Sequence, residues 1–451
     1  MSQVKWVFIA VLITSFFGPF MGSSINLAIP DMAKEFGVLP SSLTWFISAY
    51  LLGSIAVLVP MGKLADIVGR KKIYTYGLCL FIVMTIGAGL SASLEMLIIF
   101  SFLQGIASAM IFSTGMTLLV AVNKVTERGR AIGYSAAATY IGLSLGPFLG
   151  GIITHFWGWR SIFAIIALGL GLSLVAIRRV TSEWYGAKEK FDLKGSIAYC
   201  LASTGVLYGC SGYTESVWGP YFLYAGILFF VLFIRMQNII ANPILNINLF
   251  RENLIFAMSN LAAMINYSAT FAISFVLSLY LQVVRGLDAP TAGMIILIQP
   301  VLMALFSPLA GSLSDKIEPR LVATGGMILN TVGLVILFFI TETTEISYVA
   351  MALVVIGLGF ALFSSPNNNA IMGAVGEKDH GVAASVLSAM RLFGQGFSMA
   401  MVNLFLSLFI KLESDYHSAL MLGFKNIFFV FSILSFIGVF VSGARGKNRH
   451  M

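Results

Sequence analysis

The sequence predicts an all-α protein that crosses a membrane about fourteen times. Apolar residues make up 58% of its 451 residues and charged residues only 10%, and its mean hydropathy is +0.93. A soluble domain carries about 25% charged residues, so this chain has too few charges to cover a water-exposed surface. Its apolar residues also fall in runs of about 20, the length that crosses a hydrocarbon core about 30 Å thick.

The apolar runs divide the chain into six spans, a pair, and six further spans. We expect the first six at 6–29, 43–62, 73–92, 96–120, 130–154 and 161–180, the pair at 195–213 and 220–237, and the last six at 254–283, 292–313, 321–340, 347–367, 381–410 and 422–443. The run at 6–29 is too long for the apolar region of a cleaved signal peptide, so we expect it to remain as the first helix.

Basic residues indicate the topology. Most of the 27 Lys and Arg residues fall in alternate loops, such as 63–72, 124–130 and 178–194, in a ratio of about four to one over the opposite loops. Cytoplasmic loops carry this excess in membrane proteins. We therefore expect both termini in the cytoplasm, and we assign the net charge of +8 to this bias and not to nucleic-acid binding.

Short sequence repeats indicate a duplicated unit. The pattern Gly-x-Leu-x-Asp occurs at 62–66 and at 311–315, an offset of 311 − 62 = 249 residues, and an acidic residue two before a glycine occurs at 127–129 and 379–381, an offset of 252. A duplicated six-helix unit explains both offsets. The predicted divisions are an N-terminal six-helix bundle at 1–180, a linker with two inserted helices at 181–253, and a C-terminal six-helix bundle at 254–451.

The loop between the second and third predicted helices reads Gly62-Lys-Leu-Ala-Asp66-Ile-Val-Gly69-Arg70-Lys-Lys. Glycines allow a tight turn, and a carboxylate at a helix end can bind an Arg or a neighbouring helix N-terminus. The loop resembles the signature of the major facilitator superfamily, whose cluster locks the cytoplasmic side in one state. The resemblance implies a gating role for Gly62, Asp66, Gly69 and Arg70. In the second copy it implies the same role for Gly311 and Asp315. Ile67 stands where the family usually has a basic residue, and a plain positive-inside loop is the alternative.

A second motif, Gly142-Leu-Ser-Leu-Gly146-Pro147-Phe-Leu-Gly150, lies inside the fifth predicted helix. Small residues four apart let helix backbones approach closely, and proline removes a backbone hydrogen bond and creates a bend point. The segment resembles a signature of exporters in the superfamily, so it implies efflux. Ordinary close packing explains the glycines equally well and holds at the same time.

The segments 45–50, 26–30 and 159–163 extend the resemblance over nearly the whole chain, to the fourteen-helix drug:proton antiporter family. That family implies export of small amphipathic compounds by alternating access, in exchange for protons, in the plasma membrane. However, Met21 and Ser101 stand where the family commonly has an acid and an Arg, and none of the 19 Asp and Glu residues lies clearly in mid-membrane. Proton antiport is therefore implied by the resemblance alone, and a specific metabolite carrier or uniporter without proton coupling is the alternative.

Arg391 is the only basic residue deep in a predicted span. Such an Arg is costly in a bilayer and should face the protein interior or a water-filled cavity. It either attracts an anionic or zwitterionic group or holds helix ends together. Few polar anchors among Met and Phe suit amphipathic ligands, and the candidate cavity residues are Phe20, Met21, Asn26, Gln104, Asn260, Met264, Asn266, Tyr267, Gln299 and Arg391.

We expect neither a catalytic site nor a metal or cofactor. The three cysteines have no paired spacing, no Gly-rich loop precedes a Lys-Ser/Thr pair, and no His, Asp or Glu cluster supports a membrane-embedded enzyme. The triplet at 367–369 follows Pro366 and is expected to end a helix. The expected partners are a small substrate, protons and membrane lipid, and the chain is expected to act as a monomer.

Overall fold

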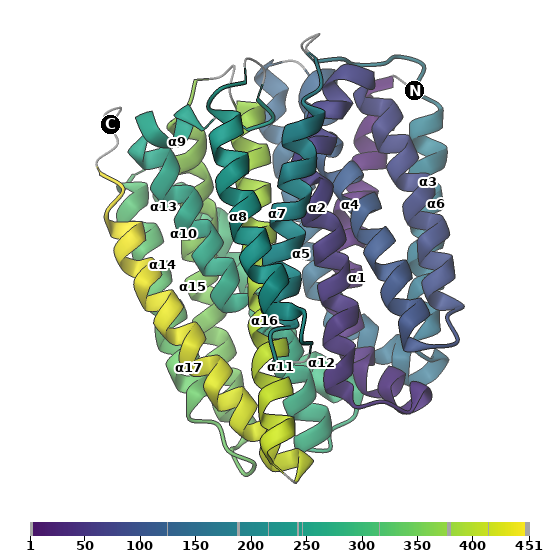
Figure 1. The fold of residues 1–451 in the computed structure, drawn as a ribbon, viewed down its shortest axis with the longest axis vertical. Coiled ribbons are helices and arrows are strands. Elements are labelled where there is room, and N and C mark those ends of the chain that lie inside the picture. Colours follow the sequence, from purple (N-terminus) through teal and green to yellow (C-terminus); the bar gives the residue numbers. More distant parts are fainter. Residues whose placement is uncertain are drawn as a thin grey trace. The chain divides into compact units, whose positions relative to one another are not determined.

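The computed structural model describes residues 3–123, 125–186, 190–214, 216–240, 243–245, 247–314, 316–376, 380–413 and 415–446, and it leaves the side chains of 125–130, 132, 380 and 381 undescribed. Helices account for most of this chain (Figure 1). Contacts divide it into two compact units, Met1–Tyr208 with Phe222–Leu245, and Gly209–Tyr221 with Asn246–Met451. The boundaries 180/181 and 253/254 stay a prediction.

The first unit contains six long helices in chain order. They are α1 (Gln3–Phe36), α2 (Thr44–Val68), α3 (Arg70–Gly89), α4 (Leu94–Val122), α5 (Val125–Trp157) and α6 (Arg160–Arg178), with a 3-10 turn η1 (Pro40–Leu43) before α2. Glycines with positive φ follow three of them: Gly37 (φ 66°) after α1, Gly69 (φ 123°) after α2 and Gly158 (φ 76°) after α5. Residues other than glycine rarely adopt this backbone conformation. The glycine turns therefore explain why each of these three helices ends there.

The second unit has more breaks than the sequence predicts. It contains α9 (Asn248–Glu252), α10 (Leu254–Thr270), α11 (Ile273–Leu279), a π-helical turn η2 (Tyr280–Val284), α12 (Ala289–Ile296), α13 (Ile298–Ser314), α14 (Pro319–Phe338), α15 (Ile346–Gly373), α16 (His380–Leu412) and α17 (Tyr416–Gly443). The predicted span 254–283 is thus divided at Phe271–Ala272, and the span 292–313 is divided at Leu297.

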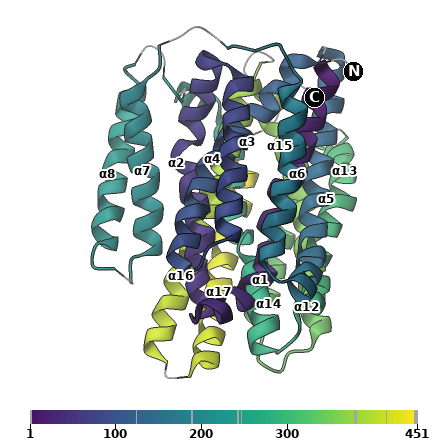
Figure 2. The same cartoon turned by 90° about the vertical axis from the view of Figure 1, so that its right-hand side faces the viewer.

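The inserted pair is α7 (Leu193–Ser211) and α8 (Gly219–Gln237), which run antiparallel side by side (Figure 2). A Cβ added to Gly205 would lie 2.8 Å from Cα of Gly226, so two glycines allow the helices to touch. Within the first unit, α7 contacts α2: the Cys200 thiol donates a hydrogen bond to the Ala56 carbonyl, with 2.8 Å between sulfur and oxygen.

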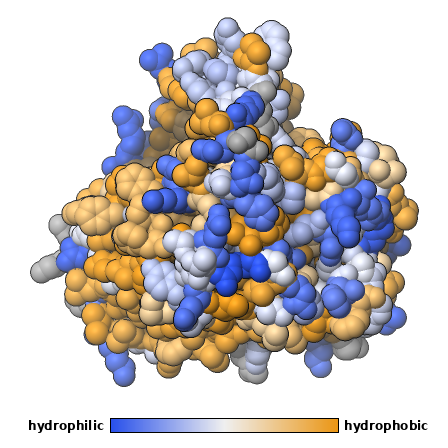
Figure 3. All heavy atoms as spheres, turned by 90° about the horizontal axis from the view of Figure 1, so that it is seen from below, coloured by the Kyte–Doolittle hydropathy of each residue, from blue (hydrophilic) through white to orange (hydrophobic). Residues whose placement is uncertain are grey.

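The predicted membrane character is confirmed. In the described residues, thirteen helical segments are long and apolar enough to cross a bilayer. They account for every predicted span except α7, whose Lys194 and small polar residues lower its mean hydropathy. Seen from one end, apolar side chains cover much of the outline and polar ones lie among them (Figure 3). This distribution suits helices that meet lipid.

The two units repeat one pattern of helix contacts. In the first unit α1 packs against α5 and α6, α2 against α4, and α3 against α4 and α6. In the second, α10 packs against α16 and α17, α13 against α15, and α14 against α15 and α17. A Cβ on Gly142 of α5 would lie 2.3 Å from the Phe16 carbonyl oxygen, and one on Gly394 of α16 would lie 2.4 Å from that of Met264. These glycines are 394 − 142 = 252 residues apart, so the predicted repeat is present in the packing.

Candidate functional site

The signature loop forms the predicted ion pair. Asp66 in the last turn of α2 binds Arg70 in the first turn of α3, with 2.7 Å between Oδ1 and Nε. Gly69 lies between the helices with φ 123°, which lets the chain reverse within one residue. The Asp66 side chain is 36% exposed and that of Arg70 is 21% exposed. Because both groups remain partly in water, the ion pair contributes little to the free energy of folding. Its interest for function lies in its position at the α2–α3 loop.

The linker after α6 lies directly on this loop, which the sequence does not predict. The Arg70 amide donates to the Trp184 carbonyl at 2.9 Å, and the Gly186 amide donates to the Asp66 carbonyl at 2.8 Å. The Glu183 carboxylate accepts from the Lys71 amide at 2.7 Å. This carboxylate therefore caps the N-terminus of α3, where it also meets the positive end of the helix dipole.

The second copy of the loop is described only in part. Asp315 lies outside the described residues. Gly311 belongs to α13, and a Cβ there would lie 2.8 Å from the Ser365 hydroxyl of α15. Ser314 accepts a hydrogen bond from the Asn369 side chain at 2.9 Å. The start of this copy thus packs against α15.

The exporter-like glycines of α5 lie against α1. A Cβ on Gly146 would lie 1.8 Å from the Ser23 hydroxyl, and one on Gly150 would lie 2.4 Å from Cβ of Ser24. Gly142 meets the Phe16 backbone as described above. Pro147 lies inside α5, which continues to Trp157. The motif is therefore the line along which these two helices make their closest approach.

In the first unit, the predicted cavity residues Phe20 and Met21 of α1 and Gln104 of α4 are all buried. The Gln104 amide nitrogen donates to Thr85 at 2.9 Å and lies 4.0 Å from the Met21 sulfur. Phe20 is buried and its ring lies 5.6 Å from that of Phe16. Oε1 of Gln104 is buried with no hydrogen-bond partner. Asn26 is also buried on α1, and it makes an interaction of its own.

In the second unit, Arg391 of α16 contacts two other helices. Nη2 donates to Oδ1 of Asn368 on α15 at 2.6 Å. The guanidinium carbon lies 5.6 Å from the ring centroid of Tyr267 on α10, close enough for a cation–π contact. Tyr267 in turn meets Phe360 edge to face at 5.4 Å. The structure therefore brings together two of the predicted cavity residues, Tyr267 and Arg391.

The other predicted polar residues of this unit have different surroundings. Asn330 of α14 donates to Asn266 of α10 at 2.8 Å, so the predicted Asn266 joins two helices. Asn260 donates to the Phe256 carbonyl of its own helix at 2.9 Å. Gln299 is buried on α13 with an unpartnered Oε1. Met264 is half-buried on α10.

The prediction that the Asn triplet 367–369 ends a helix is wrong. Pro366 lies inside α15, which continues to Gly373. Asn368 binds Arg391 and Asn369 binds Ser314. Proline marks a helix end only where its missing amide cannot be accommodated, and spanning helices tolerate it. The sequence signal that could have found Asn368 is its spacing from Ser364 and Phe360, which lie four and eight residues earlier on the same helix face.

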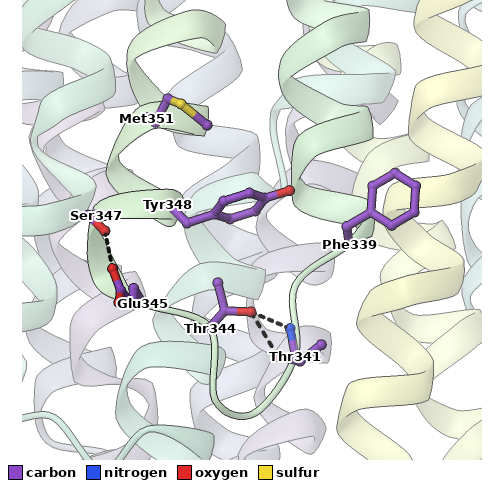
Figure 4. A pocket seen from close by; sticks show the side chains of 7 residues that line it. All are labelled: Phe339, Thr341, Thr344, Glu345, Ser347, Tyr348 and Met351. Carbon is purple, nitrogen blue, oxygen red and sulfur yellow. Dashed lines mark hydrogen bonds between the residues drawn. The ribbon is translucent and has the colours of Figure 1, made fainter.

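Acidic and metal-binding groups are sparse. Among the residues that the structure describes, no Asp or Glu is fully buried, and no group of three His, Cys, Asp or Glu side chains could hold a metal. An open cavity of about 560 Å³ lies beside the α14–α15 loop, where Thr344 accepts from the Thr341 amide at 2.7 Å (Figure 4). It is lined by Phe339, Thr341, Thr344, Glu345, Ser347, Tyr348 and Met351, none of them a predicted site residue.

Two helical bundles that repeat one contact pattern, in a chain with many candidate membrane spans, are typical of multi-pass transporters built from internal repeats. The model of the Major Facilitator Superfamily matches residues 11–395 and 259–446. The chain belongs to this superfamily and is a membrane transporter.

Relatives with different transport roles resemble the chain. It is 29% identical over 453 residues, 97% of each chain, to the riboflavin transporter RibZ of Clostridioides difficile. It is 29% identical over 403 residues, 87% of this chain and 74% of the relative, to the multidrug resistance protein Stp of Mycobacterium tuberculosis. It is 26% identical to the cephamycin export protein CmcT of Amycolatopsis lactamdurans over 84% of this chain and 80% of that protein.

Among solved structures, a bacterial homologue of the human lysosomal transporter Spinster, inward-facing and unoccupied, matches with a TM-score of 0.71. The match covers 99% of this chain and 97% of the other, at 14% identity. This likeness shows the fold alone.

Proposed function

We propose that the chain is a secondary active exporter of small amphipathic compounds. It works as a monomer by alternating access in the plasma membrane, with both termini in the cytoplasm, and exchanges its substrate for protons. The observation that carries the export direction is the close line of contact between α1 and α5. Gly142, Gly146 and Gly150 all lie on that line, and they form the motif that resembles the exporter signature. Relatives named as multidrug and cephamycin exporters support the same direction.

Gating is proposed for the signature loop. The Asp66–Arg70 pair and the linker hydrogen bonds fix the α2–α3 turn in the conformation described here. A change of conformation at this end of the unit has to break or move these contacts. Their loss therefore changes the balance between transport states more than it changes the fold, because the contacts are partly exposed and individually weak.

Proton exchange rests on the resemblance. A buried carboxylate is the usual proton carrier, since burial raises its pKa toward neutral pH. The described residues contain no fully buried Asp or Glu. This observation, together with a relative named as a riboflavin transporter that matches 97% of its length, favours the second candidate, a carrier of one metabolite without proton coupling.

Transport by purified protein in proteoliposomes tests both candidates. A panel of amphipathic dyes and riboflavin is loaded, and efflux is followed with and without a pH gradient and with a protonophore. Gradient-driven efflux of several dyes supports the exporter. Movement of riboflavin alone, unchanged by the protonophore, supports the carrier and overturns the exporter. Asp66→Asn is expected to slow transport, while the exposed Glu413→Gln serves as the matched carboxylate control.

A further inference from the structure

Arg391 is a cation that lies deep in a span. It lies 391 − 382 = 9 residues from the nearer end of the span Val382–Leu412, which is about 14 Å along a helix. In the part of the chain that the structure describes, no carboxylate forms an ion pair with it. A charge at this depth is costly in a bilayer unless it faces the protein interior or a water-filled cavity, so we expect it to serve a ligand.

Arg391 and Asn368 have hydrogen-bond donors that their mutual contact does not use. Arg391 has five N–H groups and no acceptor. One Nη2 proton is used by Asn368, while Nε is buried and has no partner. Because arginine can only donate, the Asn368 amide must turn its oxygen to Arg391, and its NH₂ group is left for another partner. Both residues therefore present N–H groups, which bind an anion or a carbonyl and repel a cation.

An aromatic pair and a glycine fix the position of this charge. The guanidinium lies over Tyr267, whose ring meets Phe360 edge to face. Gly394, one turn after Arg391, allows α16 to touch α10: a Cβ there would lie 2.8 Å from Cβ of Tyr267. Since α10, α15 and α16 all belong to one unit, the cluster is preorganised for a ligand.

We propose that Arg391 and Asn368 bind the anionic or carbonyl end of a planar aromatic substrate, whose rings stack beside Tyr267 and Phe360. This assignment rests on the proposed transport function and narrows it to substrates that carry an acceptor group. Organic cations are excluded from this subsite.

Binding to the purified full-length protein in detergent tests the assignment without any gradient. Three probes share one ring system: 9-anthracenecarboxylate, 9-anthracenemethanol and protonated 9-aminomethylanthracene, each titrated by fluorescence anisotropy. The carboxylate is expected to bind most tightly. Arg391→Gln should weaken carboxylate binding about ten- to hundred-fold, the effect of a lost charge-assisted hydrogen bond, and should not weaken binding of the ammonium probe, because the variant removes a charge that repels it.

Two further variants keep the test independent of folding defects. Asn368→Asp places a carboxylate beside Arg391 and should reverse the preference toward the ammonium probe. Lys425→Gln removes another cation that lies 5.4 Å from an aromatic ring, that of Phe338, and should change nothing. Tighter ammonium binding by the unmodified protein, or equal weakening of all three probes by Arg391→Gln, overturns the proposal. A protein that binds the carboxylate with this preference but transports nothing refutes the exporter and leaves the subsite intact.

Discussion

Replacing Gly142 by alanine adds one methyl group where α5 touches α1. The added Cβ would lie 2.3 Å from the Phe16 carbonyl oxygen, whereas a short carbon–oxygen contact is about 3.3 Å. The obstacle is backbone, which no side-chain rotation can remove. The two helices must therefore separate by about 1 Å, and the change reaches the whole line of contact between them.

The magnitude follows from a comparison with Gly133 on the same helix, which has nothing within 4 Å of its added Cβ. Alanine is better than glycine in a helix by about 1 kcal/mol, and this gain is common to both substitutions. The difference between the two variants therefore equals the overpacking cost, about 1–3 kcal/mol. At about 2–4 °C per kcal/mol, Gly142→Ala should melt about 2–12 °C below Gly133→Ala.

The assay is thermal unfolding of both variants in the same detergent, followed by transport in proteoliposomes at a temperature where both are folded. If export requires the close approach of α5 to α1, Gly142→Ala also transports more slowly than Gly133→Ala. Equal melting temperatures for the two variants would refute the packing argument.

Two further predictions follow from capping contacts. Glu183→Ala removes the cap of α3, and hydrogen exchange at residues 70–74 should quicken about tenfold, equivalent to about 1.4 kcal/mol, while Glu183→Gln, which keeps an acceptor oxygen, should change it less; equal exchange in both variants contradicts the capping role. Hydrogen bonds from Ser418 hold the pKa of the Asp415 carboxyl below its usual range, so the carboxylate stabilises the start of α17 at neutral pH and this support is lost as the pH falls below about 4. The protection of the first-turn amides of α17, measured as exchange relative to the free-peptide rate at each pH, should therefore fall at acidic pH in the unmodified protein and stay constant in Asp415→Asn.

The positions of the helices could be predicted because each span is an apolar run, but their ends could not. α1 continues to Phe36 and α5 begins at Val125, well beyond the predicted 29 and 130. Helices extend past the hydrocarbon core into water with polar residues, and a search for apolar residues misses those turns. The break between α10 and α11 was missed for the opposite reason: no glycine, proline or charge marks residues 270–273, so local packing decides it.

The contacts of the candidate site also differ in how far the sequence predicts them. The Asp66–Arg70 pair is four residues apart and follows from helix geometry. The bond from the Lys71 amide to Glu183 joins residues 112 apart, and no local pattern indicates it. Likewise Asn368 lies 23 residues from Arg391 on another helix, and only the folded unit shows that they meet.

The equivalent glycines of α5 and α16 also say something about ancestry. Gly142 and Gly394 stand one repeat length apart, and each lets its helix touch the first helix of its own bundle. Two copies of a gene that drifted freely would have lost this correspondence, since any other residue fills the space. Its presence in both halves indicates that each bundle needs the same close helix approach, as expected if one six-helix unit was duplicated.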